Sequence, residues 1–216
     1  MRIILLLVIT LFAVITTSAQ GISPLIQIIR SNHSGIARGT LSVLNGSLMP
    51  LVSTLQVTGF SVSEEGEVSL VPLPLDIHVT LSSSSVRVPP QSQSSVEFQA
   101  TCPSSCQFLI MTSDSVERRV SDGISIKVIL PETVYIEREP IRKGDITLAW
   151  QDAKTLLVSN NGGGFDRPLV DALLNNKSTP LPSIPLMPHA HRFIHFDVPP
   201  SKVTLRGEKF KLEIGQ

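Results

Sequence analysis

The 216-residue chain is poor in cysteine, in aromatic residues and in charge. It has two Cys, 5% aromatic residues and 17% charged residues, in which 18 Lys and Arg balance 18 Asp and Glu. A neutral chain lacks the basic surplus that phosphate binding needs, so we expect no nucleic acid as partner. Two cysteines are too few for a small disulfide-stapled domain. The hydrophobic fraction of 42% is too high for a disordered chain.

The one long apolar run lies at the start of the sequence. Residues 3–15 follow a positively charged Met1-Arg2 start and precede the small residues Thr17-Ser18-Ala19. This is the three-part plan of a secretory signal peptide, here residues 1–19, with a mature start near Gln20. The alternative is an uncleaved anchor helix, but the run is shorter than the roughly 20 residues that a membrane span needs. We therefore expect an exported protein with no membrane insertion after signal cleavage.

Strands rather than helices are predicted for the rest of the chain. Sixteen prolines exclude long helices over most of it. Short runs rich in Val, Ile, Leu and Thr alternate with clusters of Ser, Pro, Gly and Asn, and in residues 41–44 and 55–58 every second residue is apolar. The predicted fold class is all-β, built from β-sandwiches. The predicted strands are residues 25–30, 39–44, 52–62, 75–81, 96–101, 108–112, 124–130, 146–150, 155–158, 168–173, 192–196 and 210–214.

The number of strands indicates two domains. About seven strands come first, which is the number in one immunoglobulin-like sandwich, and a second group of strands follows. Prolines and a charge cluster interrupt the pattern between the two groups. We predict an N-terminal immunoglobulin-like domain at residues 20–131, a hinge at 132–142 and a C-terminal β-sandwich domain at 143–216.

The two cysteines, Cys102 and Cys106, flank a Pro-Ser-Ser turn between two predicted strands. In an oxidising compartment, cysteines this close at the ends of a turn favour a disulfide that clamps a hairpin. Redox-active pairs prefer two intervening residues and a helix start. Metal binding by two cysteines also lacks neighbouring ligands here. We therefore predict a structural disulfide.

The sequence shows no catalytic constellation, so neither an enzyme nor a cofactor is predicted. The Gly-x-Ser-x-Gly pattern of serine hydrolases does not occur. His189, His191 and His195 fall on one face of a strand pattern, where a zinc site is the alternative to a polar outer face. Asn161-Gly162-Gly163-Gly164 lacks the Lys-Ser/Thr of a phosphate loop and is typical of a turn.

Four segments follow one another in an order and spacing found in a known family. They are residues 41–50, 86–98, 124–131 and 156–162. Together they resemble periplasmic pilus-assembly chaperones of the PapD-like type, over nearly the whole mature chain. The resemblance implies two immunoglobulin-like sandwiches in a bent, boomerang-like arrangement and a location in the periplasm. Its implied partners are pilus or fimbrial subunits and an outer-membrane usher.

The resemblance also implies a site. The family binds a subunit's C-terminal carboxylate between its domains with an Arg of the first strand and a Lys of the strand before the hinge, positions that match Arg30 and Lys127. Forked guanidinium and ammonium groups bind a carboxylate through charge-assisted hydrogen bonds. The strand before the hinge also donates alternate apolar side chains to an incomplete subunit. That role matches Ile124, Ile126 and Val128.

The function implied is that of a chaperone that stabilises subunits by carboxylate anchoring and donor-strand complementation and delivers them for outer-membrane assembly. Glu97 and Leu130 stand where the family usually has Arg, so its ordinary internal charge network is not expected. A secreted or surface structural or adhesin β-sandwich protein is the competing hypothesis. Arg30 and Lys127 distinguish the two, because they converge on one cleft in a chaperone and lie apart in a structural protein.

Overall fold

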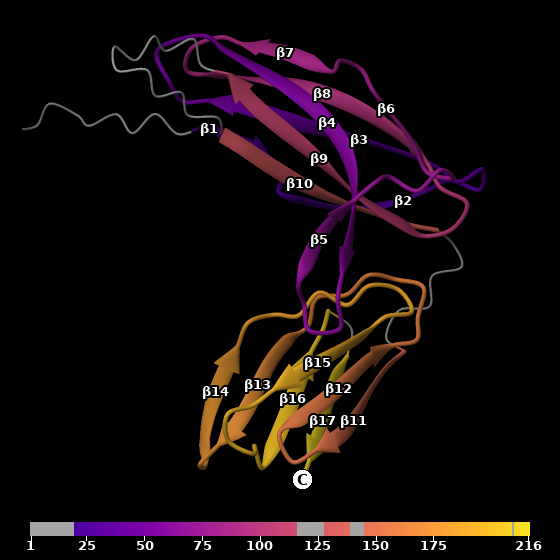
Figure 1. Ribbon diagram of the computed structural model, residues 1–216, viewed down its shortest axis with the longest axis vertical. Coiled ribbons are helices and arrows are strands. Elements are labelled where there is room, and N and C mark those ends of the chain that lie inside the picture. The colour runs from indigo at the N-terminus through magenta and orange to yellow at the C-terminus, as the bar shows by residue number, and fades with distance from the viewer. Residues whose placement is uncertain (1–19, 116–127, 139–144, 209) are drawn as a thin grey trace, which may run out of the picture.

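The computed structural model describes residues 20–115, 128–138, 145–208 and 210–216. These residues form seventeen strands and no helix, which confirms the all-β fold class. Figure 1 shows two β lobes set at an angle to each other. No helix able to cross a membrane occurs among the described residues. The predicted signal peptide, residues 1–19, and the site residues Ile124, Ile126 and Lys127 lie outside them.

The N-terminal domain is a sandwich of two sheets. The first sheet contains, in order, β1 (Gln20–Ser23), β3 (Ile36–Asn45), β8 (Ser92–Thr101) and β6 (His78–Leu81). The second contains, in order, β2 (Ile26–Arg30), β10 (Val128–Glu137), β9 (Cys106–Ser115), β4 (Leu51–Val62) and β5 (Val68–Val71), and β7 (Ser85–Val88) also pairs with β4. The chain changes from the first sheet to the second at the cis peptide bond between Ser23 and Pro24.

The alternating sequence pattern builds the core of this sandwich. Leu41 and Val43 of β3 point inward from the first sheet, and Phe108 and Ile110 of β9 point inward from the second. Residues two apart in a strand share a face, so each strand buries one row of side chains. Phe108 joins the sheets through an edge-to-face contact with Phe98, with ring centroids 6.0 Å apart. Burial of these inward rows holds the two sheets together.

The C-terminal domain is a smaller sandwich. Its three-stranded sheet contains β11 (Ile146–Asp152), β12 (Thr155–Asn160) and β15 (His191–His195). Its four-stranded sheet contains β14 (Lys177–Leu181), β13 (Leu169–Leu174), β16 (Lys202–Arg206) and β17 (Lys211–Gly215). Leu156 and Val158 of one sheet meet Val170 and Leu205 of the other in a core separate from that of the first domain.

Strand β10 extends into the residues predicted as the hinge. It runs through Pro131 to Glu137, paired with β9 on one side and with β2 on the other. The predicted hinge at 132–142 is therefore wrong for residues 132–137, which belong to the N-terminal domain. Pro131 does not end the strand, because its nitrogen faces away from β9. The Thr133 N–H donates to the Leu25 carbonyl on the β2 side, and backbone groups two residues apart point the same way, so Pro131 removes no donor from the β9 pairing.

A disulfide joins Cys102 and Cys106, as the spacing predicts. It closes the connection between β8 and β9, and Cys106 is the first residue of β9. The closed loop therefore starts the strand that lies next to β10 in the second sheet.

Removal of the Phe108 ring tests whether the two domains have separate cores. Phe108 is 0% exposed, so Phe108→Ala is expected to lower the free energy of unfolding of the N-terminal domain by about 3–5 kcal/mol. Urea unfolding followed by circular dichroism measures this loss. The single tryptophan, Trp150, reports the C-terminal domain by fluorescence, and its transition is expected to stay in place. An equal shift of the Trp150 transition would contradict separate cores.

Candidate functional site

The two domains meet at a small cluster of aromatic side chains. Tyr135 of β10 stacks on Phe165 of the C-terminal domain, with ring centroids 3.8 Å apart and planes 15° from parallel. Phe60 of β4 meets Tyr135 edge to face at 6.1 Å, and Met187 packs against the group. Stacked and edge-to-face arrangements are favourable aromatic geometries. The end of β10 is therefore anchored in the domain junction.

Hydrogen bonds fix the junction at three further points. The Glu137 carboxylate accepts from the Phe165 backbone N–H at 3.2 Å, and the Ser105 hydroxyl donates to the Gly163 carbonyl at 3.1 Å. The Phe193 N–H donates to the carbonyl of Glu64 at 2.9 Å. Glu64 lies between β4 and β5, whose hairpin reaches the C-terminal domain in Figure 1. Contacts at separate points hold the angle between the domains.

The loop closed by the disulfide contacts the segment that leaves the first domain. The Arg138 backbone N–H donates to the Ser105 hydroxyl at 3.1 Å. The Arg138 guanidinium donates to the carbonyls of Cys102 and Pro103. The loop between β8 and β9 thus joins both the linker segment and the C-terminal domain.

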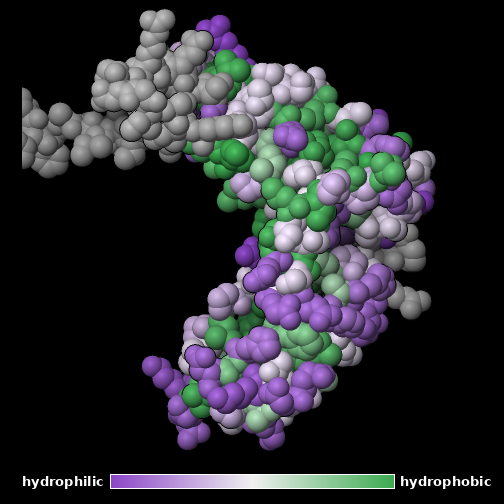
Figure 2. All heavy atoms as spheres, in the orientation of Figure 1, coloured by the Kyte–Doolittle hydropathy of each residue, from purple (hydrophilic) through white to green (hydrophobic). Residues whose placement is uncertain are grey.

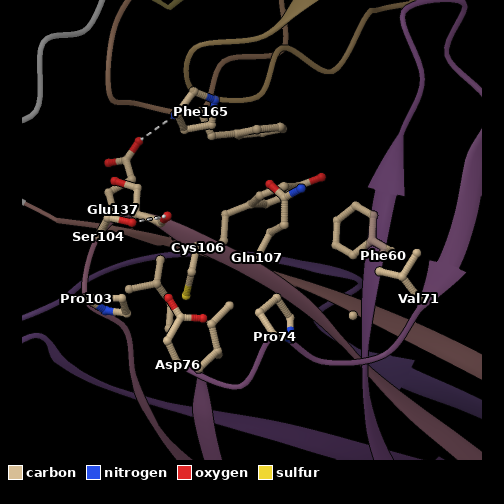
Figure 3. A pocket seen from close by; sticks show the side chains of 16 residues that line it. Phe60, Val71, Pro74, Asp76, Pro103, Ser104, Cys106, Gln107, Glu137 and Phe165 are labelled. Carbon is tan, nitrogen blue, oxygen red and sulfur yellow. Dashed lines mark hydrogen bonds between the residues drawn. The ribbon is translucent and has the colours of Figure 1, made fainter.

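A cavity of about 350 Å³ lies beside the aromatic cluster. Figure 3 shows Phe60 and Phe165 around it, with the Glu137 carboxylate joined to Phe165 by a hydrogen bond and with Asp76 and Cys106 also lining it. No Lys or Arg lines this cavity among the described residues. Carboxylates that line a site repel the carboxylate of a ligand. This cavity therefore does not fit the predicted carboxylate ligand.

Two buried ionisable side chains flank the junction. Arg192 of β15 is 3% exposed and donates through Nε to the Pro185 carbonyl at 3.1 Å. Burial lowers the pKa of Arg192, against the opposing effects of Tyr135 and Glu65. Burial raises the pKa of Tyr135 to about 12. Tyr135 therefore stays neutral at physiological pH and packs as an uncharged ring.

Arg30 lies at the junction end of β2. It is exposed, and it pairs in register with Glu137 of β10. Val128, the first described residue of β10, stands nine residues before Glu137, which corresponds to about 30 Å along a strand. Lys127 is bonded directly to Val128, and consecutive Cα atoms are about 3.8 Å apart, so this length of β10 leaves the two positions too far apart for their side chains to meet. Lys127 itself lies outside the described residues, but the register of β10 with β2 contradicts its predicted convergence with Arg30.

The first half of β10 is an open strand edge in the described part of the protein. β9 pairs with β10 from Val128 to Ile136, whereas β2 covers the other side only from Thr133 to Glu137. Ile129 and Pro131 face the uncovered side, as Thr133 faces β2. The edge therefore offers the Ile129 N–H, the Ile129 carbonyl and the Pro131 carbonyl to another strand.

Apolar side chains lie exposed beside this edge. Ile129 is 48% exposed, and Ile26 and Ile28 of β2 and Val52 of β4 are exposed as well. The pairing registers place all four on the outer face of the sheet. In Figure 2, hydrophobic residues gather on the N-terminal domain and hydrophilic ones predominate on the C-terminal domain. The apolar face and the open edge together form a surface suited to a partner chain.

The histidines do not form a cluster of ligands in the described residues. His191 and His195 are exposed on β15, and each ring nitrogen Nδ1 lies near a hydroxyl of β12, at 2.9 Å from Ser159 and 3.3 Å from Thr155. His189 precedes the strand, with φ of 56°. No group of three His, Cys, Asp or Glu side chains suited to a metal ion occurs among the described residues.

Loss of the Phe165 ring tests how the junction is held. Phe165→Ala removes the stack on Tyr135 and its buried area, so we expect the coupling between the domains to weaken by about 2–4 kcal/mol. Small-angle X-ray scattering is expected to show a broader distribution of interatomic distances. Leu169→Ala, at a side chain exposed on β13, is the matched control and is expected to scatter as the native protein does. Identical scattering of the Phe165 variant would mean that the aromatic contact does not set the angle.

No family model matches the sequence, and no curated protein matches it either. Solved structures do resemble the protein. The CfaA chaperone of class 5 fimbriae has a TM-score of 0.63 at 10% identity, over 92% of this chain and 99% of that one. The CupB2 chaperone of Pseudomonas aeruginosa has a TM-score of 0.65 at 9% identity, over 90% and 99%. The Salmonella enterica SafA pilin in complex with the SafB chaperone gives 0.64 at 13% identity, over 92% and 97%. The protein therefore has the two-domain β-sandwich fold of the fimbrial chaperones, as the sequence resemblance implies.

Proposed function

We propose that the protein is a periplasmic chaperone that binds pilus or fimbrial subunits, stabilises them and delivers them to an outer-membrane usher. The observation that carries the proposal is the open edge of β10 between Val128 and Glu132, in a fold that it shares with fimbrial chaperones. One of the similar structures contains a pilin in complex with its chaperone. An exported subunit with an incomplete sheet needs such an edge, because its own exposed strands would otherwise aggregate.

Strand addition at β10 supplies the first part of the mechanism. A partner strand would accept from the Ile129 N–H and donate to the carbonyls of Ile129 and Pro131. Main-chain hydrogen bonds give affinity, and alternate side chains give fit. Val128 is half-buried, in register with Asp114. We propose Val128, together with Ile124 and Ile126, as the apolar side chains that β10 and the segment before it donate to the subunit.

Carboxylate anchoring supplies the second part. Arg30 is exposed and makes no ion pair with any described residue. Its guanidinium is therefore available for a ligand at the junction end of β2. A forked guanidinium forms two parallel hydrogen bonds with a carboxylate. We propose that Arg30 binds the C-terminal carboxylate of the subunit.

Substitution at Ile129 tests strand addition. Ile129→Pro removes the N–H donor of the open edge but none of the hydrogen bonds to β9, so capture of the subunit is expected to fall at least tenfold while the fold survives. Ile129→Ala keeps the N–H and is expected to retain most of the capture. Co-purification of the tagged mature protein from periplasmic extract, with the partner identified by mass spectrometry, gives the readout. Equal capture by the proline variant and the alanine variant would count against strand addition.

A peptide pair tests the carboxylate anchor. A peptide copying the C-terminus of the captured subunit is expected to bind at least tenfold more tightly with a free carboxylate than with a C-terminal amide. Arg30→Ala is expected to abolish this difference. Lys127→Ala removes a cation next to Val128, is the matched control and is expected to keep the difference. Isothermal titration calorimetry measures the six affinities, of the two peptides for the native protein and for the two variants. A native protein that binds both peptides equally would remove Arg30 from the site.

A further inference from the structure

A carboxyl group is fully buried in the strand to which we assign subunit binding. Glu132 of β10 is 0% exposed and lies in register with Ile110 of β9. It stands on the inner face of the sheet, next to the apolar side chain of Val134 two residues along. Glu132 also marks a boundary, because the pairing with β2 begins at the next residue, Thr133. Burial of a carboxyl group with incomplete hydrogen bonding costs free energy, and the cost is larger when the group is ionised.

A single side chain, Gln27 of β2, holds the Glu132 carboxyl. The Gln27 amide donates one hydrogen bond to Glu132 Oε1 and another to the Thr40 carbonyl of β3, at 2.8 Å. Glu132 Oε2 is buried and makes no hydrogen bond with any residue that the structure describes. Gln27 thus connects β2 to β10 in its own sheet and to β3 in the facing sheet. We call the contact between Gln27 and Glu132 the latch.

The charge of Glu132 is set by burial. Burial raises the pKa of Glu132 to about 7, against the smaller lowering effect of the Gln27 hydrogen bond. The group is neutral below that pH and ionised above it. The pKa of Glu132 is raised while β2 is paired with β10 and the carboxyl is buried. The paired arrangement is therefore favoured over an arrangement with β2 released at low pH, and it loses that advantage as pH rises from about 4.5 to about 7.

The elements packed against Glu132 bring no cation to it among the described residues. On β9, Asp114 shares the inner face, and its pairing with Val128 places it four residues along β10, or about 13 Å away. Burial raises the pKa of Asp114 as well. On β3, Arg38 is exposed and donates to Gln99 of β8 on the outer face of the first sheet. Ionised Glu132 therefore keeps only the Gln27 hydrogen bond.

We propose that the latch controls how much of β10 is open to a partner strand. With Glu132 neutral, β2 stays paired with β10 from Thr133 to Glu137, and the open edge is limited to the residues before it. With Glu132 ionised, the buried charge favours release of β2, and the open edge extends toward the junction. The opening itself is a property of the free protein, whereas its use for subunit capture rests on the proposed function.

Amide hydrogen exchange of the free mature protein at pH 6 and pH 8 tests the latch. After correction for intrinsic rates, protection of the Thr133 amide, which donates to Leu25, is expected to fall about tenfold between the two pH values. Glu132→Gln cannot ionise and is expected to show no such fall. Asp114→Asn is the matched control at the other buried carboxyl and is expected to keep the tenfold change. An unchanged Thr133 protection in the native protein, or the same fall in Glu132→Gln, overturns the latch.

A second variant keeps the test decisive if Glu132→Gln does not fold. Gln27→Met removes the donor but leaves the carboxyl, so Thr133 protection is expected to be lower than native at both pH values. Protection equal to native at both pH values overturns the latch.

Binding of the subunit at the two pH values separates the latch from the proposed function. Native binding is expected to be several-fold tighter at pH 8 than at pH 6, and Glu132→Gln is expected to bind equally at both. A latch seen in exchange but without a change in binding overturns its link to capture. That outcome leaves the test of strand addition at Ile129 unaffected.

Discussion

The pairing of β10 with its two neighbours is the interaction on which the rest of the structure depends. On one side β9 pairs with it from Val128 to Ile136, and on the other β2 covers its second half. That covered half carries Tyr135 and Glu137 into the domain junction, where they contact Phe165. The uncovered half leaves a short edge with exposed Ile129. One strand therefore joins the sandwich, fixes the angle between the domains and offers a surface to a partner.

Among the described residues, stacked aromatic rings and hydrogen bonds hold the junction together. Tyr135 and Phe165 stack, Glu137 accepts from the Phe165 backbone, and the neighbouring cavity is lined by Asp76 and Glu137. Between Val128 and Glu137 the strand contains neither Lys nor Arg. Any anion bound near the end of β2 therefore depends on Arg30 and on groups outside β10. The open edge, rather than a formed cation pair, is what the described residues contribute to the proposed chaperone function.

The alternating pattern of apolar residues made most strands predictable from the sequence. It failed where a strand is short or polar. β16 has two Lys or Arg residues among its five, and β14 contains Pro180, so neither shows a clear apolar period. The predicted hinge starts too early because Pro131 interrupts the apolar pattern in the sequence but not the strand itself. Whether a proline ends a strand depends on which side its nitrogen faces, and that is known only when both neighbours, β9 and β2, are known.

The junction and the latch were beyond sequence reasoning for a related reason. Tyr135 and Phe165 are separated by the linker, and no periodicity connects them. Glu132 falls in the predicted hinge, where a solvated position is the ordinary expectation for a charged residue. Its burial follows from the register with Ile110 and from Gln27, 105 residues away in sequence. Contacts of this kind are set by long-range pairing, whereas local pattern sets only which segments become strands.

The most direct measurement is the exchange of the Ile129 amide in the free protein and in its complex with the captured subunit. If the partner adds a strand to β10, this amide becomes hydrogen-bonded in the complex, and its exchange is expected to slow by at least tenfold. A partner that binds stably while Ile129 exchanges as fast as in the free protein would contradict the account.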